Sequence, residues 1–324
     1  MLEPLQLQSW PRNQIPQPRP AGAVTQSAQL YYAIFGRFAQ PLELSAARYK
    51  FAGIPDGLKV SLLTGELKQD VLDDCHSIKP LRESFEQLAP ELQREVDAAP
   101  ECVLMIGEFD GDRLDNLDYM RDTMGFVSAL FGNGGVALYD PMQFRWWCEM
   151  DWLRSVYEPA MPNPLDHVLI LQSPDTVFDT NWLYTRGMRK YGRPDLSFHC
   201  VESDRLAAAT ALLEWLIEKM ADGWLLDIDA EGLEIRMPGA ASANKLLPPV
   251  ICRPGGSLDD PIFNNFHVEI RLKPMSLDFH VFLRFSPWSF VREIDITYFG
   301  QKISMRTGIS RRGYEQGRRQ QRSS

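Results

Sequence analysis

The chain has 324 residues, of which 44% are hydrophobic and 24% are charged, and this ordinary globular composition excludes wholesale disorder, collagen and a small disulfide scaffold. The formal net charge is −9, which makes the chain a poor general binder of nucleic acid, because phosphate contacts need clustered positive charge. No apolar run is long enough for a transmembrane helix, so we expect no membrane partner.

The cysteines and the charge distribution indicate a compartment. The five cysteines are odd in number and widely spaced, and the Pro- and Gln-rich N-terminus lacks the features of a secretory signal, so we expect reduced thiols in a cytoplasmic protein. The dispersed histidines and cysteines form no metal-binding spacing, and we expect neither a metal nor a cofactor. Residues 302–324 carry seven basic residues and one acid, which is typical of a solvated terminus or of a contact for RNA, anionic lipid or an acidic partner.

The first part of the chain alternates predicted strands and helices after a flexible lead. Three apolar runs predict strands: 29–35, 59–63 and 102–109. Residues 78–99 have helical apolar spacing that Pro90 interrupts, which predicts a kink or two short helices. A further helix should have Asp112 as its N-cap and should end at the glycines of 132–135.

The middle of the chain shows two more helix starts. After a strand at 136–139, Asp140-Pro141 has the pattern of an N-cap followed by an N1 proline, which predicts a helix reaching Tyr157. The Pro-rich segment 159–164 marks a candidate domain boundary. Strands are predicted at 167–171, 181–185 and 195–201. Asp204 should cap a helix that ends at Gly223.

The last part of the chain predicts hairpins and one long connection. The expected strand pairs are 224–228 with 232–237, 266–272 with 279–285, and 294–299 with 302–306. Residues 238–264 have no regular pattern and indicate a functional loop or a linker.

These elements predict an α+β fold with mixed or antiparallel sheets and helices packed on one face. The expected organisation is a flexible lead, a first α/β module, a second α+β module and a basic disordered tail, at 1–28, 29–160, 161–306 and 307–324. Two stretches share the order strand, Asp-Arg-Leu, helix, glycine, strand, Asp, beginning their helices at Asp112 and Asp204. This order indicates either an internal duplication or the general likeness of any strand–helix–strand unit.

One segment resembles known families. Tyr184, Thr185, Gly187, Met188, Gly192, Pro194 and Asp195 match a pattern of uncharacterised bacterial domain families: Tyr-Thr-x-Gly-Leu, three residues, then Gly-x-Pro-Glu. The chain has methionine and aspartate where that pattern has leucine and glutamate, and the resemblance covers only residues 181–228. It implies a bacterial origin and an α+β module, and it implies no activity.

The same segment is the first candidate binding site. Thr185, Arg186, Arg189, Lys190 and Arg193 form a basic loop that could hold a phosphate or a carboxylate. The structural interpretation of the segment is that Gly187 and Gly192 supply turns with positive φ and that Pro194 precedes a strand.

The second candidate site is the polar face of the 266–285 hairpin. Strand alternation places His267, Glu269 and Arg271 on one face, opposite His280 and Arg284 of the partner strand. This cluster could recognise an anion or a partner. The alternative is the solvated side of an antiparallel sheet.

No catalytic motif accompanies these residues. The glycines of 132–135 follow a helix, whereas a phosphate loop precedes one, and no nucleophile elbow occurs. We therefore expect a bacterial cytoplasmic binding or accessory protein that acts through protein–protein contacts in immunity, defence or secretion, with a protein partner or a homo-oligomer. The alternative is an enzyme acting on a phosphorylated or carboxylated small molecule, which requires the candidate residues to converge in one pocket.

Overall fold

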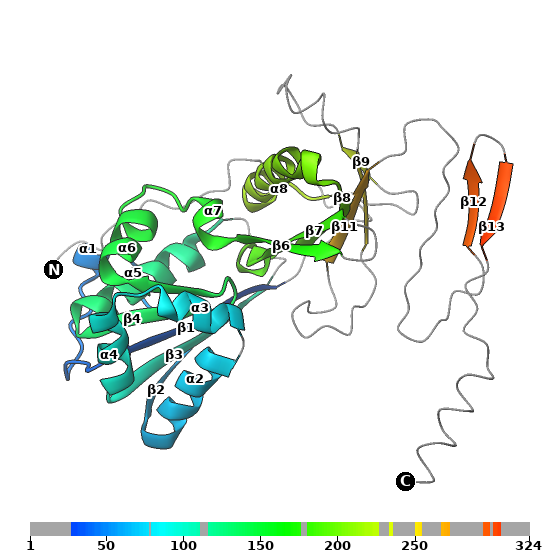
Figure 1. The fold of residues 1–324 in the computed structure, drawn as a ribbon. Helices are drawn as coiled ribbons and strands as arrows, with labels where there is room; N and C mark the ends of the chain where they lie inside the picture. Colours follow the sequence, from blue (N-terminus) through cyan, green and yellow to red (C-terminus); the bar gives the residue numbers. More distant parts are fainter. Residues whose placement is uncertain are drawn as a thin grey trace, which may run out of the picture. The chain divides into compact units, whose positions relative to one another are not determined.

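The fold is α+β, as expected (Figure 1). The computed structural model describes residues 27–77, 79–110, 116–175 and 180–226, together with five later strands. These strands are β9 (Leu233–Ile235), β10 (Val250–Pro254), β11 (His267–Leu272), β12 (Ile294–Tyr298) and β13 (Gln301–Met305). The chain divides into two units, Met1–Arg271 and Leu272–Ser324. No helix in the described part is both long and apolar enough to cross a membrane.

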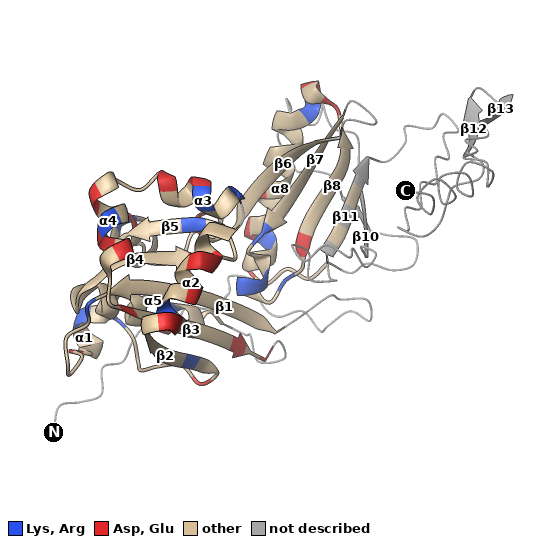
Figure 2. Ribbon diagram, turned by 60° about the horizontal axis from the view of Figure 1, so that its bottom comes forward, with Lys and Arg blue, Asp and Glu red and all other residues tan. Residues whose placement is uncertain are grey.

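A five-stranded antiparallel sheet forms the first half of the larger unit. Its strands are β1 (Ala28–Gly36), β2 (Leu58–Thr64), β3 (Glu101–Phe109), β4 (Gly135–Asp140) and β5 (Arg145–Cys148). Their order is β2-β3-β1-β4-β5, which places β1 in the centre (Figure 2). The predictions of the first four strands are confirmed, because alternating or continuous apolar runs bounded by polar residues are what a buried strand requires.

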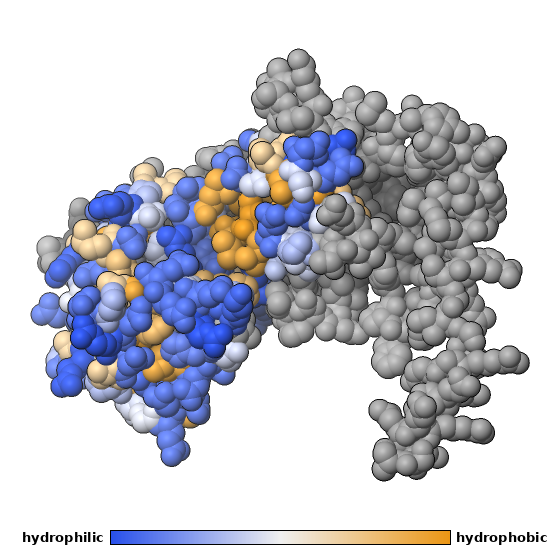
Figure 3. Space-filling view, viewed as in Figure 1, coloured by the Kyte–Doolittle hydropathy of each residue, from blue (hydrophilic) through white to orange (hydrophobic). Residues whose placement is uncertain are grey.

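Three helices cover one face of this sheet: α2 (Gly65–Ser77), α3 (Lys79–Glu86) and α4 (Pro90–Ala98). Pro90 is in the first turn of α4, where its missing N–H costs nothing, and the predicted interruption is confirmed. The core beneath the helices contains Phe35, Phe85, Cys102 and Trp146. The outward sides of these helices are largely hydrophilic (Figure 3).

Further helices cover the opposite face: α5 (Asp118–Gly132), α1 (Ala46–Tyr49), α6 (Glu149–Trp152) and the π-helix η2 (Leu153–Tyr157). Trp152 is fully buried there, and its indole N–H donates to the Ser128 hydroxyl at 3.0 Å. The Tyr32 ring meets the Trp152 ring edge-on with a centroid distance of 6.0 Å. The five-stranded sheet therefore has helices on both faces, whereas the sequence predicted helices on one face only.

The second sheet has the order β6-β7-β8-β11-β10-β9 and is mixed, because β11 pairs with β8 in parallel. Its first strands are β6 (Leu169–Asp175), β7 (Thr180–Arg186) and β8 (Asp195–Val201). Three short helices, α7 (Pro164–His167), η3 (Met188–Tyr191) and η4 (Ser203–Arg205), connect these elements. Helix α8 (Leu206–Ala221) packs against β7 and β8, where Leu183 and Phe198 are buried.

Several predicted helix starts are wrong. Asp140-Pro141 opens a turn, and β5 follows it. Trp146 and Trp147 are both buried. A helix with one apolar face cannot bury two neighbouring residues equally, whereas a strand directs them to opposite faces of the sheet, where each can be buried. Helix α5 begins at Asp118, and Asp112 lies outside the described residues. Asp204 belongs to η4, and α8 begins two residues later.

Two predicted hairpins are also wrong. Residues 224–226 form no strand, and β9 pairs with β10, which lies inside the segment predicted to be a loop. Both edges of β11 are hydrogen-bonded, one to β8 and one to β10, so β11 has no edge for residues 279–285, which lie outside the described residues. The hairpin of β12 and β13 is confirmed. The internal duplication is not confirmed.

Candidate functional site

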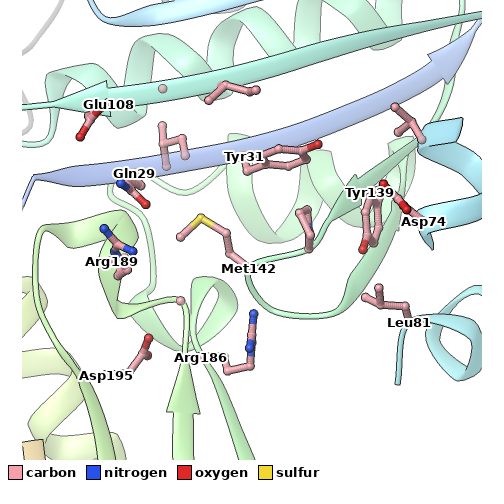
Figure 4. A pocket seen from close by; sticks show the side chains of 16 residues that line it. Gln29, Tyr31, Asp74, Leu81, Glu108, Tyr139, Met142, Arg186, Arg189 and Asp195 are labelled. Atoms are coloured by element: carbon pink, nitrogen blue, oxygen red, sulfur yellow. The ribbon is translucent and has the colours of Figure 1, made fainter. Parts of the chain in front are cut away.

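A cleft of about 490 Å³ opens between the five-stranded sheet and the segment that joins β7 to β8 (Figure 4). It is lined by strands β1, β3 and β4, by helices α2 and α3, and by the β4–β5 turn. Arg186, Gly187, Arg189 and Asp195 line it from the other side. Part of the 181–228 segment thus contributes directly to the cleft.

The five-stranded sheet supplies one wall of the cleft. Gln29 pairs with Glu108, and Tyr31 pairs with Ile106, so these four residues project from the same face of neighbouring strands. Helices α2, α3 and α4 cover the more distant part of this face and leave Ile106 45% exposed. The wall is therefore both polar and accessible.

A tight turn after β7 supplies the two arginines. Gly187 has a φ of +112°, and a Cβ atom there would lie 2.4 Å from the His167 carbonyl oxygen. Gly192 has a φ of +65° and ends η3. The structural interpretation of both glycines is confirmed, because only glycine adopts these conformations without strain. The turn directs Arg186 and Arg189 into the same cleft.

A buried ion pair anchors this turn to the five-stranded sheet. The Lys190 ammonium group bonds to the Asp140 carboxylate, and both side chains are fully buried. Burial lowers the pKa of Lys190 and raises the pKa of Asp140, and each partner opposes the shift of the other. The Tyr119 hydroxyl of α5 also donates to the Lys190 carbonyl oxygen at 2.6 Å. Lys190 is therefore a positioning residue for its neighbour Arg189.

Asp195 is an acid of the cleft whose pKa is raised toward neutrality. Its Oδ1 accepts from the Thr185 hydroxyl at 2.9 Å and from the Met188 N–H at 3.2 Å. Burial raises the pKa of Asp195 to about 6, against the opposing effect of these hydrogen bonds and of Arg186 and Arg189. A carboxyl group of this kind can exchange a proton near physiological pH.

The two arginines differ in their surroundings. The Arg186 guanidinium stacks over the Phe144 ring, 4.2 Å from its centroid. The Arg189 Nε is buried and has no hydrogen-bond partner in the described part of the chain. Burial lowers the pKa of Arg189, and the charges of Asp195 and Glu108 oppose that shift. Neither of these two acids forms an ion pair with Arg189. Arg189 therefore keeps donor capacity for a ligand.

The other predicted loop residues have structural roles. Thr185 is fully buried, and its hydroxyl also accepts from the Leu196 N–H at 2.8 Å. Arg193 is 5% exposed and donates to the Met220 and Gly223 carbonyl oxygens at the end of α8. Neither residue lines the cleft.

The side chains of the second predicted cluster lie outside the described part of the chain. His267 pairs through its backbone with Asp195, and Glu269 pairs with Ser197, in the parallel ladder of β8 and β11. His280 and Arg284 lie outside the described residues.

Sequence reasoning missed the wall opposite the arginines. The sequence identifies Gln29, Tyr31 and Tyr139 only as strand residues, and Asp74 carries no signal of a site. The period-2 alternation of β1 placed Gln29 and Tyr31 on one face, but no local pattern indicates which distant segment faces that side.

The comparisons with known proteins add no relative. No family model, no curated protein and no solved structure matches the chain. The resemblance of residues 181–228 therefore stays an expectation. In the part of the chain that the structure describes, no group of three His, Cys, Asp or Glu side chains is placed to hold a metal ion.

Proposed function

We propose that the protein binds a small phosphorylated or carboxylated molecule in this cleft. The observation that carries the proposal is the convergence of Arg186 and Arg189, through the Gly187 turn, on an accessible polar wall. Guanidinium groups suit carboxylate and phosphate oxygens, since both present planar or clustered acceptors to a rigid fork of donors. This ligand class is the one of the alternative function inferred from the sequence, an enzyme acting on a phosphorylated or carboxylated small molecule.

The shape of the site also favours a small molecule. The candidate residues come from separate elements and line one concave space, rather than a flat surface. A cleft of this volume lies within the range of small-ligand sites. Asp195 gives the same cleft a group that could act as an acid or base on a bound substrate. This group is the basis for proposing an enzymatic activity.

The proposal is tested by calorimetric titration of inorganic phosphate and of straight-chain carboxylates into the full chain. Arg189→Gln should weaken binding of the preferred anion at least tenfold, about 1.4 kcal/mol, because a charge-assisted contact is lost. Arg82→Gln is the matched control, since Arg82 is an exposed arginine of α3 outside the cleft. Equal affinities in both variants and the unchanged chain would overturn the proposal.

A second candidate function is the protein–protein contact that the sequence predicts. We infer that the partner is a second copy of this chain. Strand β2 lies at an edge of the five-stranded sheet, and it exposes Val60 by 37% and Leu62 by 48%. Open strand edges pair readily with other strands. A cytoplasmic location is part of the proposal, and Cys75, Cys102 and Cys148, which are free thiols, support a reducing compartment.

A further inference from the structure

The charges that face the cleft are mixed in sign. The cleft is lined by the guanidinium groups of Arg186 and Arg189 and by the carboxyl groups of Asp74, Glu108 and Asp195. The two formal positive charges are outnumbered by three formal negative ones, so the cleft has no net positive formal charge. A ligand that carried only negative charge would therefore meet repulsion as well as attraction.

Asp74 and Arg189 lie at opposite ends of the cleft. Asp74 lies beside Tyr139, whereas Arg189 lies near Gln29 and Glu108 (Figure 4). The Asp74 carboxylate forms no ion pair and accepts no hydrogen bond in the described part of the chain. An exposed carboxylate in this position can receive a cation without first giving up a protein partner.

Two tyrosines and two aliphatic side chains complete the Asp74 end. Burial raises the pKa of Tyr31 and of Tyr139, so both phenols stay neutral at physiological pH. Neither hydroxyl bonds to another described residue. Neutral aromatic rings beside a carboxylate attract ammonium groups, and Val71 and Leu81 add apolar contact for an alkyl chain.

We infer that the ligand is zwitterionic: a carboxylate or phosphate binds between Arg186 and Arg189, and an ammonium group binds between Asp74 and the rings of Tyr31 and Tyr139. This inference rests on the proposed function, since it uses the same arginines for the acid. It names a class of substrate, the amino acids and phosphorylated amines whose charges lie at opposite ends of a short chain.

The test compares probes that share one acid and differ at the far end. Titrations use ω-amino acids from three to eight carbons, the unsubstituted acids of equal length, and the matching dicarboxylates. O-phosphoethanolamine and ethyl phosphate form the corresponding phosphate pair. At the preferred length, the amino compound should bind at least tenfold tighter than the unsubstituted acid, and the dicarboxylate should bind more weakly than either.

Two variants assign the ammonium site. Asp74→Asn should reduce the preference for the amino compound to less than threefold, and it should not weaken binding of the unsubstituted acid, because it removes a negative charge from the cleft. Asp73→Asn is the matched control, since it removes the same charge from the neighbouring position of α2, outside the cleft. The Asp73→Asn variant should prefer the amino compound over the unsubstituted acid as strongly as the unchanged chain does.

The outcomes separate the two proposals. One outcome is that acids bind through Arg189, but no ω-amino acid binds more tightly than the unsubstituted acid and O-phosphoethanolamine binds no more tightly than ethyl phosphate. The zwitterion inference is then overturned, and the anion site stands. If Asp73→Asn lowers the preference as much as Asp74→Asn does, the site assignment is overturned. If no acid binds and Arg189→Gln changes nothing, the proposed function itself fails.

Discussion

The ionisation of Asp195 links the chemistry of one side chain to the affinity of the cleft. Its carboxyl group lies in the same space as Arg186 and Arg189, and burial raises its pKa to about 6. Above that pH it is a carboxylate that offsets one of the two guanidinium charges. Below that pH it is neutral, and the positive charge of the arginines is no longer opposed by it.

Anion affinity should therefore rise as the pH falls through about 6. Sulfate is a suitable probe, because its charge is constant between about pH 5 and 8. We expect its affinity to increase about three- to tenfold over that range, and Asp195→Asn to bind with the higher affinity at every pH. An affinity that is flat in the unchanged chain, or that falls on acidification, would contradict this role.

The same substitution has a defined effect on stability. A raised carboxyl pKa means that the folded chain holds the proton more tightly than the unfolded chain, so this group favours folding as the pH falls from about 6 toward 4. Asparagine keeps an acceptor for the Thr185 hydroxyl and the Met188 N–H. The free energy of unfolding of Asp195→Asn at pH 7 should therefore not decrease.

At the scale of elements, the Lys190–Asp140 pair fixes the β7–η3 turn against β4. Both groups are fully buried, so their separate charges would be costly without the contact between them. The pair also places Arg189, the residue before Lys190, at the cleft. We therefore expect the pair to affect stability and ligand binding together.

Replacing one partner of this pair should be far more damaging than replacing both. Lys190→Met leaves Asp140 buried and unpaired, and it should lower the free energy of unfolding by about 3–5 kcal/mol in urea titrations. The double variant Lys190→Met with Asp140→Asn removes both charges and keeps an acceptor for the Met142 N–H, so it should recover most of that loss. A single variant within about 1 kcal/mol of the unchanged chain would refute this role.

The elements that the sequence predicted correctly are those with a strong local pattern. Strand β1, strand β3 and the helices separated by Pro90 each have an apolar period that packing reinforces. The sequence predicts a helix where the turn before β5 lies, because Asp140-Pro141 has the local form of a helix start. The burial of both Trp146 and Trp147 is compatible with a strand and not with a helix that has one apolar face.

The same limit applied to the site. Arg186 and Arg189 were found because they cluster within a few residues, whereas Asp74, Tyr31 and Tyr139 come from three elements far apart in the chain. Lys190 was grouped with them by sequence, yet its partner Asp140 lies 50 residues away. Local spacing contains no information about which distant strand meets a loop.

At the scale of the whole molecule, the edge of the five-stranded sheet is the feature that concerns self-association. Val60 and Leu62 pair with Met105 and Val103 of β3 and share their face of the sheet. The β3 residues are buried, while the two β2 residues remain exposed. Antiparallel pairing of β2 with its copy would extend the sheet and cover both side chains.

Sedimentation at increasing protein concentration tests this pairing. The unchanged chain should show a dimer, and Leu62→Lys should shift the equilibrium toward monomer at least tenfold, because an edge lysine would be brought against an apolar strand. Ser61→Lys is the comparison, since Ser61 projects from the opposite face of β2. A chain that stays monomeric at all concentrations would contradict the proposal.

The most direct test of the anion site is the arginine Nε–Hε correlation spectrum of the ¹⁵N-labelled full chain, with the Arg189 signal assigned from its loss in Arg189→Gln. During titration with the straight-chain carboxylates, inorganic phosphate and ω-amino acids, we predict a saturable shift of the Arg189 signal and no change at the exposed Arg82. An Arg189 signal that none of these ligands shifts would contradict the central claim that this cleft binds a carboxylate or phosphate.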